Sequence, residues 1–162
     1  MFNKILVPLD ESRLAEAVLP YAVELATSFR GRILILHVVP PTSQVVGLTG
    51  ATDLGPIVTT DLNAISATLE AELQKAESYL KTVGAKLEGQ GVQVERKVRQ
   101  GPVGPAIVQC AREEKVDIIA LSTHGRSGLG RLVFGSIADH VLRRSGLPIL
   151  LIKPDTKGEG EG

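Results

Sequence analysis

The chain has 162 residues with 18 Lys and Arg against 18 Asp and Glu, so its formal net charge is zero. This balance argues against a nucleic-acid-binding protein, which normally carries a basic excess. Aromatic residues make up only 3% and Trp is absent, so any bound planar ring would have to lie between aliphatic side chains. The single cysteine, Cys110, allows no intrachain disulfide. No apolar run reaches membrane-spanning length and the N-terminus lacks a signal-peptide pattern, so we expect a cytoplasmic protein without a membrane partner.

The first part of the chain predicts two buried strands separated by a helix. The apolar runs KILVPLD (4–10) and RILILHVV (32–39) are typical of strands that are buried on both faces of a sheet. Between them, residues 11–29 carry the apolar periodicity of a helix. We expect Ser12 to cap this helix and Pro20 to bend it.

The middle of the chain predicts an irregular segment, a long helix and an edge strand. Residues 42–61 are rich in Ser, Thr, Gly and Pro and predict a mobile lid or a partly ordered excursion. Residues 62–88 have the spacing of a long amphipathic helix. VQVERKV (92–98) alternates between apolar and polar residues, which predicts a half-exposed strand at a sheet edge.

The last third predicts two more helices and two more strands. Residues 104–115 and 136–146 have helical patterns, and 116–122 is a buried strand. PILLIK (148–153) is the last strand, and residues 155–162 read as a flexible tail.

Strands that alternate with helices in this way predict an α/β fold with an open parallel five-stranded sheet and helices on both faces. We expect one domain over residues 1–154, with strand order 3-2-1-4-5. Ligands of such sheets bind beyond the carboxyl ends of the strands, where the strand order reverses. The loop after residues 4–10 would then face the loop after residues 116–122 across one crevice.

The second of these loops is the glycine-rich stretch STHGRSGLGRLVFGS (122–136). It contains neither the dinucleotide fingerprint G-x-G-x-x-G nor the Lys-Ser/Thr pair of a P-loop. Gly135 and Ser136 open a helix whose first N–H groups lack internal partners, and such groups favour an anion. The alternative is a flexible glycine loop with Ser136 as a plain N-cap, and the spacing alone leaves both open.

Taken together, KILVPLDES, RILILHVV, VDIIALSTHG and FGSIADHVLRRSGLPILLIK resemble the universal stress protein family, of the kind that binds ATP. The family's nucleotide motif is G-x2-G-x9-G-[ST]. Gly125, Gly135 and Ser136 match its second part, and Ser122 replaces its first glycine. The resemblance implies a Rossmann-like sheet similar to that of the adenine nucleotide alpha hydrolases.

The resemblance also implies a ligand and a set of binding residues. The ligand would be ATP, with AMP or ADP as alternatives, and Mg²⁺ would be held through the phosphates. Asp10 would read the adenine edge, and Arg126 is either a phosphate partner or a solvated charge. Gly128 would let the loop turn around the phosphates. The other positions implied to line the site are Pro8, Leu9, Val38, Leu121, Ser122, Gly125, Gly135, Ser136 and Ile137.

Three further expectations complete the sequence-based interpretation. No Walker lysine or general base is evident, so we expect at most slow ATP hydrolysis by a stress-response regulator or adaptor. The alternative is a family member that binds no nucleotide and acts as a dimeric interaction module, which the replacement at Ser122 supports. An adenylating enzyme of related architecture ranks last, because its motifs are absent from PLDES (8–12).

Two further structural expectations concern the last strand and one histidine. The strand PILLIK is apolar yet falls at a sheet edge, so we expect a homodimer through this C-terminal strand. His37 follows an apolar run and is expected to be a packed, hydrogen-bonded histidine.

Overall fold

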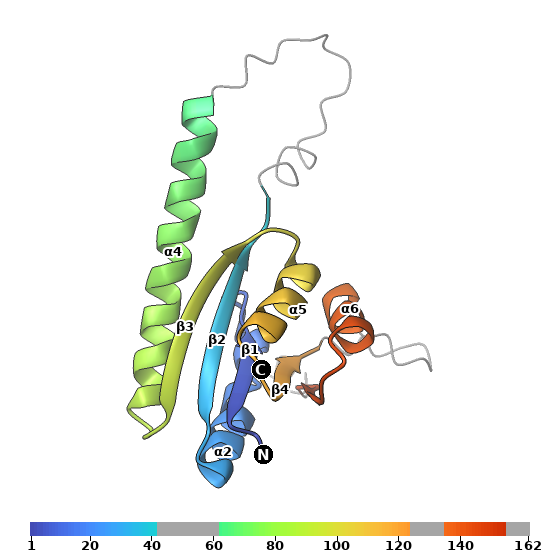
Figure 1. Cartoon of the computed structure of the whole chain (residues 1–162). Helices are drawn as coiled ribbons and strands as arrows, with labels where there is room; N and C mark the ends of the chain where they lie inside the picture. The colour runs from blue at the N-terminus through green and yellow to red at the C-terminus, as the bar shows by residue number, and fades with distance from the viewer. Residues whose placement is uncertain (42–61, 124–134, 155–162) are drawn as a thin grey trace, which may run out of the picture.

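A parallel five-stranded sheet lies at the centre of the computed structural model, which describes residues 1–41, 62–123 and 135–154 (Figure 1). Its strand order is β3-β2-β1-β4-β5, and all four ladders are parallel, as the sequence predicts. The strands are β1 (Lys4–Pro8), β2 (Arg32–Val39), β3 (Gln93–Gln100), β4 (Ile118–Ser122) and β5 (Ile149–Ile152). The expected lid at 42–61 and tail at 155–162 lie outside the described residues.

Helices cover both faces of the sheet. They are α1 (Arg13–Glu16), α2 (Leu19–Phe29), α4 (Leu62–Glu88), α5 (Val103–Glu113) and α6 (Ser136–Arg144). The predicted bent helix at 11–29 is in fact two helices, because Pro20 lies in the first turn of α2. Proline is tolerated there, since that N–H has no helical partner anyway. The Ser12 cap is confirmed: its Oγ accepts a hydrogen bond from the N–H of Ala15 at 3.0 Å.

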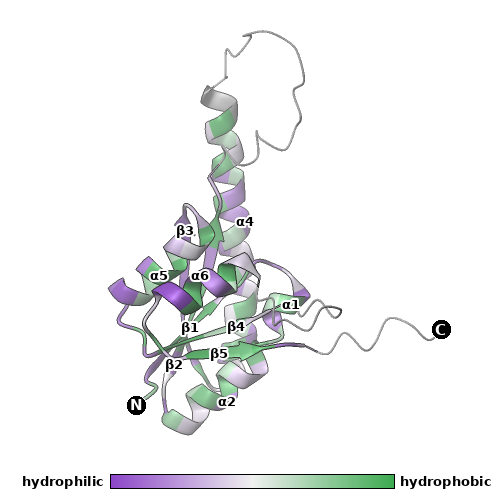
Figure 2. Cartoon of the chain, turned by 90° about the vertical axis from the view of Figure 1, so that its right-hand side faces the viewer, coloured by the Kyte–Doolittle hydropathy of each residue, from purple (hydrophilic) through white to green (hydrophobic). Residues whose placement is uncertain are grey.

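The sheet separates two hydrophobic clusters, one under each helix layer. Odd-numbered residues of β2, such as Ile33 and Ile35, pack with α2 and α4. Even-numbered residues, such as Leu34 and Leu36, pack with α5 and α6. Alternate side chains of a strand point to opposite faces, so a strand that is apolar throughout fills both clusters. Figure 2 shows this apolar centre as green strands between helices of mixed colour.

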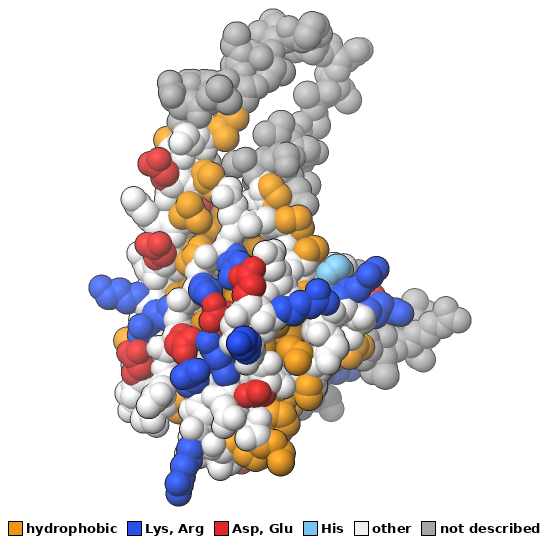
Figure 3. All heavy atoms as spheres, in the orientation of Figure 1, with side chains coloured by type: hydrophobic (Ala, Val, Ile, Leu, Met, Phe, Trp, Pro, Cys, Tyr) orange, Lys and Arg blue, Asp and Glu red, His pale blue; other side chains and the backbone are white. Residues whose placement is uncertain are grey.

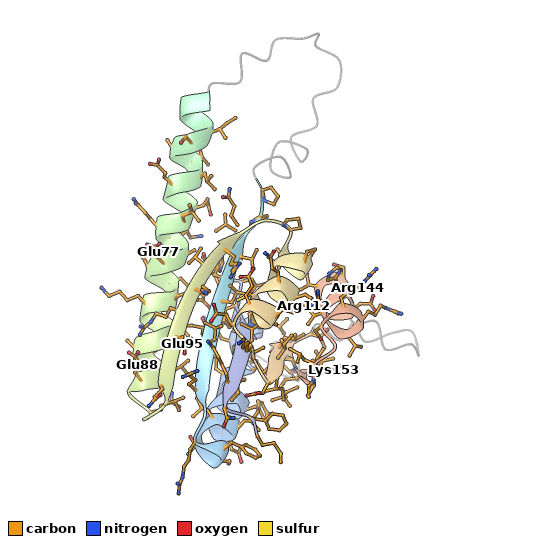
Figure 4. The ribbon with its side chains drawn as sticks, viewed as in Figure 1. Glu77, Glu88, Glu95, Arg112, Arg144 and Lys153 are labelled. Atoms are coloured by element: carbon orange, nitrogen blue, oxygen red, sulfur yellow. The ribbon has the colours of Figure 1, made fainter. Side chains whose placement is uncertain are left out.

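Charged side chains form a network beside the amino end of β1. The Nζ of Lys4 lies 2.6 Å from Glu95 Oε2 and 2.8 Å from Glu114 Oε2. Glu95 also pairs with Arg32, and Glu114 with Lys97. Burial alone would lower the pKa of Lys4, but the hydrogen bonds that its ammonium group donates to Glu114 and Glu95 outweigh burial and raise this pKa. Figure 3 shows the resulting mixture of blue and red side chains on one face, and Figure 4 labels Glu95 within it.

The two edges of the sheet differ in their covering. Helix α4 lies along β3, so that a Cβ on Gly84 would come within 2.3 Å of the Nε of Arg96 (Figure 1). The four residues of β5 at the other edge are all apolar and all partly exposed. Within the described part of the chain, no helix is both long and apolar enough to cross a membrane.

Candidate functional site

A cavity of about 490 Å³ lies at the carboxyl ends of β1, β2 and β4. Its lining comes from the loops after these strands, from α1, α4 and α5, and from the start of α6. Nine of the residues that the sequence singled out line it: Pro8, Leu9, Asp10, Val38, Leu121, Ser122, Gly135, Ser136 and Ile137. The remaining three, Gly125, Arg126 and Gly128, lie outside the described residues.

The cavity forms where two neighbouring strands part. The ladder between β1 and β2 continues to Pro8 opposite Leu36. The ladder between β1 and β4 contains only two pairs, the last of which joins Leu6 and Ile119. Strand order reverses at this junction, so the chain leaves β1 and β4 toward opposite layers and opens a crevice between them.

The turn between β1 and α1 presents Asp10 at one side of the cavity. Asp10 Oδ1 accepts hydrogen bonds from the N–H of Ser12 at 3.0 Å and from its hydroxyl at 2.5 Å. Ser12, rather than Asp10, caps α1 through its contact with Ala15. Asp10 therefore shapes the turn with one carboxylate oxygen, and its other oxygen has no protein partner among the described residues.

The amino end of α6 forms another side of the cavity. Gly135 is the N-cap and makes no side-chain capping bond, and Ser136 is the first residue of the helix. The interpretation of Ser136 as a plain N-cap is therefore wrong. The first hydrogen bond of α6 runs from the Asp139 N–H to the Gly135 carbonyl at 2.9 Å, so the preceding N–H groups have no helical partner. These groups and the helix dipole make this end of the cavity favourable for an anion.

Between these two sides the cavity walls are aliphatic. Leu9, Val38 and Leu121 are each at most 7% exposed, and Val103 and Ile107 of α5 add to the same surface. Among the lining residues that the structure describes there is no Phe, Tyr or Trp. The described walls between the two sides are therefore aliphatic rather than aromatic.

Two buried polar atoms at the cavity have no hydrogen-bond partner among the described residues. They are His37 Nδ1 and Ser122 Oγ, and both residues line the cavity. The expectation of a hydrogen-bonded His37 is thus wrong for Nδ1, although the ring does pack edge-on against Tyr79 with centroids 6.1 Å apart. An unsatisfied buried polar atom costs about 1–3 kcal/mol, so both atoms favour a polar ligand or ordered water in this cavity.

Sequence reasoning missed the contribution of α4 to the cavity. Lys75 is the only Lys or Arg among the described lining residues, and its Nζ lies 2.9 Å from Glu11 Oε2. On the sequence, Lys75 looks like any charge on the solvated face of a long helix. Only the packing of α4 beside the turn that follows β1 brings Lys75 and Glu11 together, and no local pattern encodes that packing.

A dedicated metal centre finds no support in the described residues. No group of three or more His, Cys, Asp or Glu side chains among them could hold a metal ion. The carboxylates that line the cavity are Asp10 and Glu11, and each already has a protein partner.

The chain thus forms an open parallel α/β domain with a cavity at its topological switch point, where sheets of this kind bind ligands. The model of the universal stress protein family matches residues 1–153, and the chain belongs to that family. Universal stress protein MJ0531 of Methanocaldococcus jannaschii is 30% identical over 159 residues, which covers 97% of this chain and 85% of the relative.

Two solved structures extend the comparison. MJ0577 of the same organism is 29% identical over 166 residues, covering 94% of this chain and 96% of the relative. Its structure superposes with a TM-score of 0.76, covering 97% of this chain and 99% of that one. The universal stress protein of Archaeoglobus fulgidus in complex with dAMP has a TM-score of 0.60 at 22% identity, with 94% and 100% of the two chains covered. At that identity the likeness shows the fold alone.

Proposed function

We propose that this chain is an ATP-binding universal stress protein that acts as a nucleotide-dependent regulator or adaptor in a stress response. The observation that carries the proposal is the composition of one cavity. An aliphatic slot, a carboxylate with one oxygen that has no described partner, and a helix end without a side-chain cap among the described residues line the same space. The dAMP complex of the Archaeoglobus fulgidus protein supports an adenine nucleotide as the class of ligand.

In this proposal each part of the nucleotide meets a suitable group. The adenine lies between Val38 and Leu121, and the free oxygen of Asp10 accepts a hydrogen bond from the adenine amino group. The phosphates lie at the start of α6, where backbone N–H groups and the Ser136 hydroxyl donate to them. Mg²⁺ is held by phosphate oxygens and water, because the described lining offers no set of carboxylates for it.

Hydrolysis of ATP is expected to be slow. A hydrolase must position and deprotonate a water beside the γ-phosphate, usually with a side chain of suitable pKa. Asp10 and Glu11 are the acidic residues among the described lining, and both belong to the turn after β1 rather than to α6. Binding, and not turnover, is therefore the proposed biochemical role.

A homodimer through β5 is part of the same proposal. This edge strand is apolar at every position and is partly exposed along its whole length. Pairing with the same strand of a second copy would satisfy its backbone groups and cover its side chains. The two sheets would then continue into one.

The second candidate function is a dimeric interaction module that binds no nucleotide. Ser122 favours it, since this residue replaces the first glycine of the family motif and is half-buried at the cavity. A side chain there occupies space that a glycine would leave to the ligand.

Isothermal titration calorimetry of the purified chain with ATP and Mg²⁺ separates the two candidates. The proposed function expects saturable heat with one site per chain, together with release of an adenine nucleotide when the protein as purified is heat-denatured. A folded protein that gives no heat and releases no nucleotide would leave the interaction module as the function.

A further inference from the structure

Helix α4 contacts the segment after β1 through two side chains that are four residues apart. The Nζ of Lys75 pairs with Glu11 Oε2 at 2.9 Å, and the Tyr79 hydroxyl donates to Glu16 Oε1 at 2.9 Å. Residues at this spacing lie on the same face of a helix, so one strip of α4 makes both contacts. Neither Lys75 nor Tyr79 belongs to the nucleotide motif of the sequence.

The two acidic partners flank the short helix that follows Asp10. Glu11 comes directly after Asp10, and Glu16 is the last residue of α1. Helix α1 has only four residues, contains no buried side chain, and is capped by Ser12 at its start. Such a short helix has little stability of its own, so contacts to a longer element must hold it in place.

The backbone at Glu11 shows that this turn needs outside support. Its φ is +68°, in the left-handed region that residues other than glycine rarely adopt. Strained backbone of this kind persists only where the surrounding contacts determine it. The ion pair with Lys75 acts directly on the strained residue, which lies at the rim of the cavity.

The contact at the other end of α1 is less exposed. The hydrogen bond between Tyr79 and Glu16 is partly buried, and the Tyr79 ring packs against His37, which also lines the cavity. Burial and, after it, the hydrogen bond to Glu16 raise the pKa of Tyr79 far above its usual range. The phenol therefore stays protonated, and able to donate this hydrogen bond, at neutral and mildly alkaline pH.

We propose that Lys75 and Tyr79 are positioning residues that hold the turn carrying Asp10 against the nucleotide site. This role rests on the proposed function, because Asp10 matters there as the residue that reads the adenine. The two residues of α4 do not touch the ligand themselves. They fix the two ends of α1, and the Ser12 hydrogen bonds then fix the Asp10 carboxylate.

The first test uses the ligand-free protein. Hydrogen exchange followed by NMR reports on the Ser12 amide, whose N–H is donated to Asp10 Oδ1. In the double variant Lys75→Met, Tyr79→Phe, the proton of this amide should exchange with solvent about tenfold faster than in the wild type. That factor is expected for the loss of one exposed ion pair and one hydrogen bond. The control Lys81→Met changes an exposed residue of α4 that has no hydrogen-bond or ion-pair partner in the described part of the chain, and its Ser12 amide should exchange as in the wild type. Exchange of Ser12 at the wild-type rate in the double variant would overturn the proposal, whether or not the chain binds nucleotide.

The second test compares the affinities of adenosine, AMP and ATP by calorimetry. If the α4 residues position Asp10, the double variant should weaken all three ligands by the same factor, about three- to tenfold. Exchanging the charges, with Glu11→Lys and Lys75→Glu together, should recover part of the loss seen for Lys75→Glu alone. If the double variant lost affinity for ATP and AMP but not for adenosine, Lys75 would contact the phosphates directly. That result would overturn its positioning role. Absence of binding in the wild type would refute the proposed function, while the exchange result would still decide the role of α4.

Discussion

Gly135 is a residue whose side-chain-free position the described fold does not explain. Among the described residues, a Cβ at this position would meet no atom within 4 Å, and the φ of −57° suits any residue. Nothing in the described structure therefore requires glycine there. The space that a side chain would fill lies at the start of α6, where the phosphates are proposed to bind.

We therefore expect Gly135→Val to leave the unfolding free energy within about 0.5 kcal/mol of the wild type. At ATP concentrations that saturate the wild type, the Gly135→Val variant should give no calorimetric signal. Gly89→Val is the matched control, because Gly89 lies away from the cavity and a Cβ there makes only ordinary contacts of 3.5 Å. Normal ATP binding by Gly135→Val would place the phosphates elsewhere.

Glu114 predicts how stability depends on pH. Hydrogen bonds from Lys4 and, after it, Lys97 lower the pKa of Glu114 from 4.5 to about 2. A carboxyl whose pKa is lowered by folding contributes stability above its unfolded pKa, and this contribution disappears as the pH falls toward the folded value. Chemical denaturation should therefore show a fall in unfolding free energy between about pH 4.5 and pH 2 that is less steep in Glu114→Gln. Glu77→Gln, at an exposed site on α4, should keep the wild-type slope.

At the residue scale, the sequence predicted identities better than it predicted contacts. The family resemblance was enough to place Asp10 at the cavity, and the motif spacing was enough to place Gly135 there. Lys75 and Tyr79 could not, since their partners lie 64 and 63 residues away along the chain. The unpartnered Nδ1 of His37 was likewise beyond prediction, because it depends on how β2 packs against α4.

At the scale of elements, the bounds of α4 illustrate what periodicity can predict. The expected helix at 62–88 coincides with α4 (Leu62–Glu88), because a long amphipathic pattern ended by glycines leaves little ambiguity. The segment before α2 was harder to predict. Four residues of α1 give too short a pattern to distinguish one bent helix from two.

The packing of α5 on α6 gives a prediction for two elements together. A Cβ on Gly104 of α5 would lie 2.9 Å from Cδ2 and 3.2 Å from Cβ of His140 on α6. Because the clash includes the base of the histidine side chain, rotation of the ring cannot relieve it. Gly104→Val should therefore lower the unfolding free energy by about 1–3 kcal/mol, measured by urea denaturation. Adding His140→Ala should restore part of this loss. If the two substitutions changed the unfolding free energy by independent, additive amounts, direct packing between the two residues would be contradicted.

At the scale of the whole molecule, the alternation of strands and helices together with one half-polar strand was enough to predict the sheet order. A right-handed crossover rule leaves few ways to arrange five parallel strands, and the half-polar pattern of 92–98 identified one edge. The assembly could not be derived in the same way. It depends on whether the apolar edge at β5 is covered by a second copy.

The proposed dimer predicts that a charge on β5 produces a monomer. Leu151→Lys introduces an ammonium at the partly exposed edge, where it would lack solvation between two paired strands. Size-exclusion chromatography with light scattering should give a dimer for the wild type and a monomer for this variant, with unchanged circular dichroism. Gln100→Lys, at an exposed position of the opposite edge strand β3, should remain a dimer. A wild-type monomer at micromolar concentration would refute the assembly.

Cys110 lies in the layer that borders the cavity. It is fully buried in α5, and burial, more than any other influence, raises the pKa of its thiol. A thiol reagent can reach it only when α5 lifts from the sheet, so the labelling rate of the native chain measures how often this layer opens. Val103 and Ile107 of the same helix line the cavity, so a ligand bound there should stabilise α5 in its contact with the sheet. The slowing of thiol labelling by a bound ligand would therefore report occupancy of the site without any added probe.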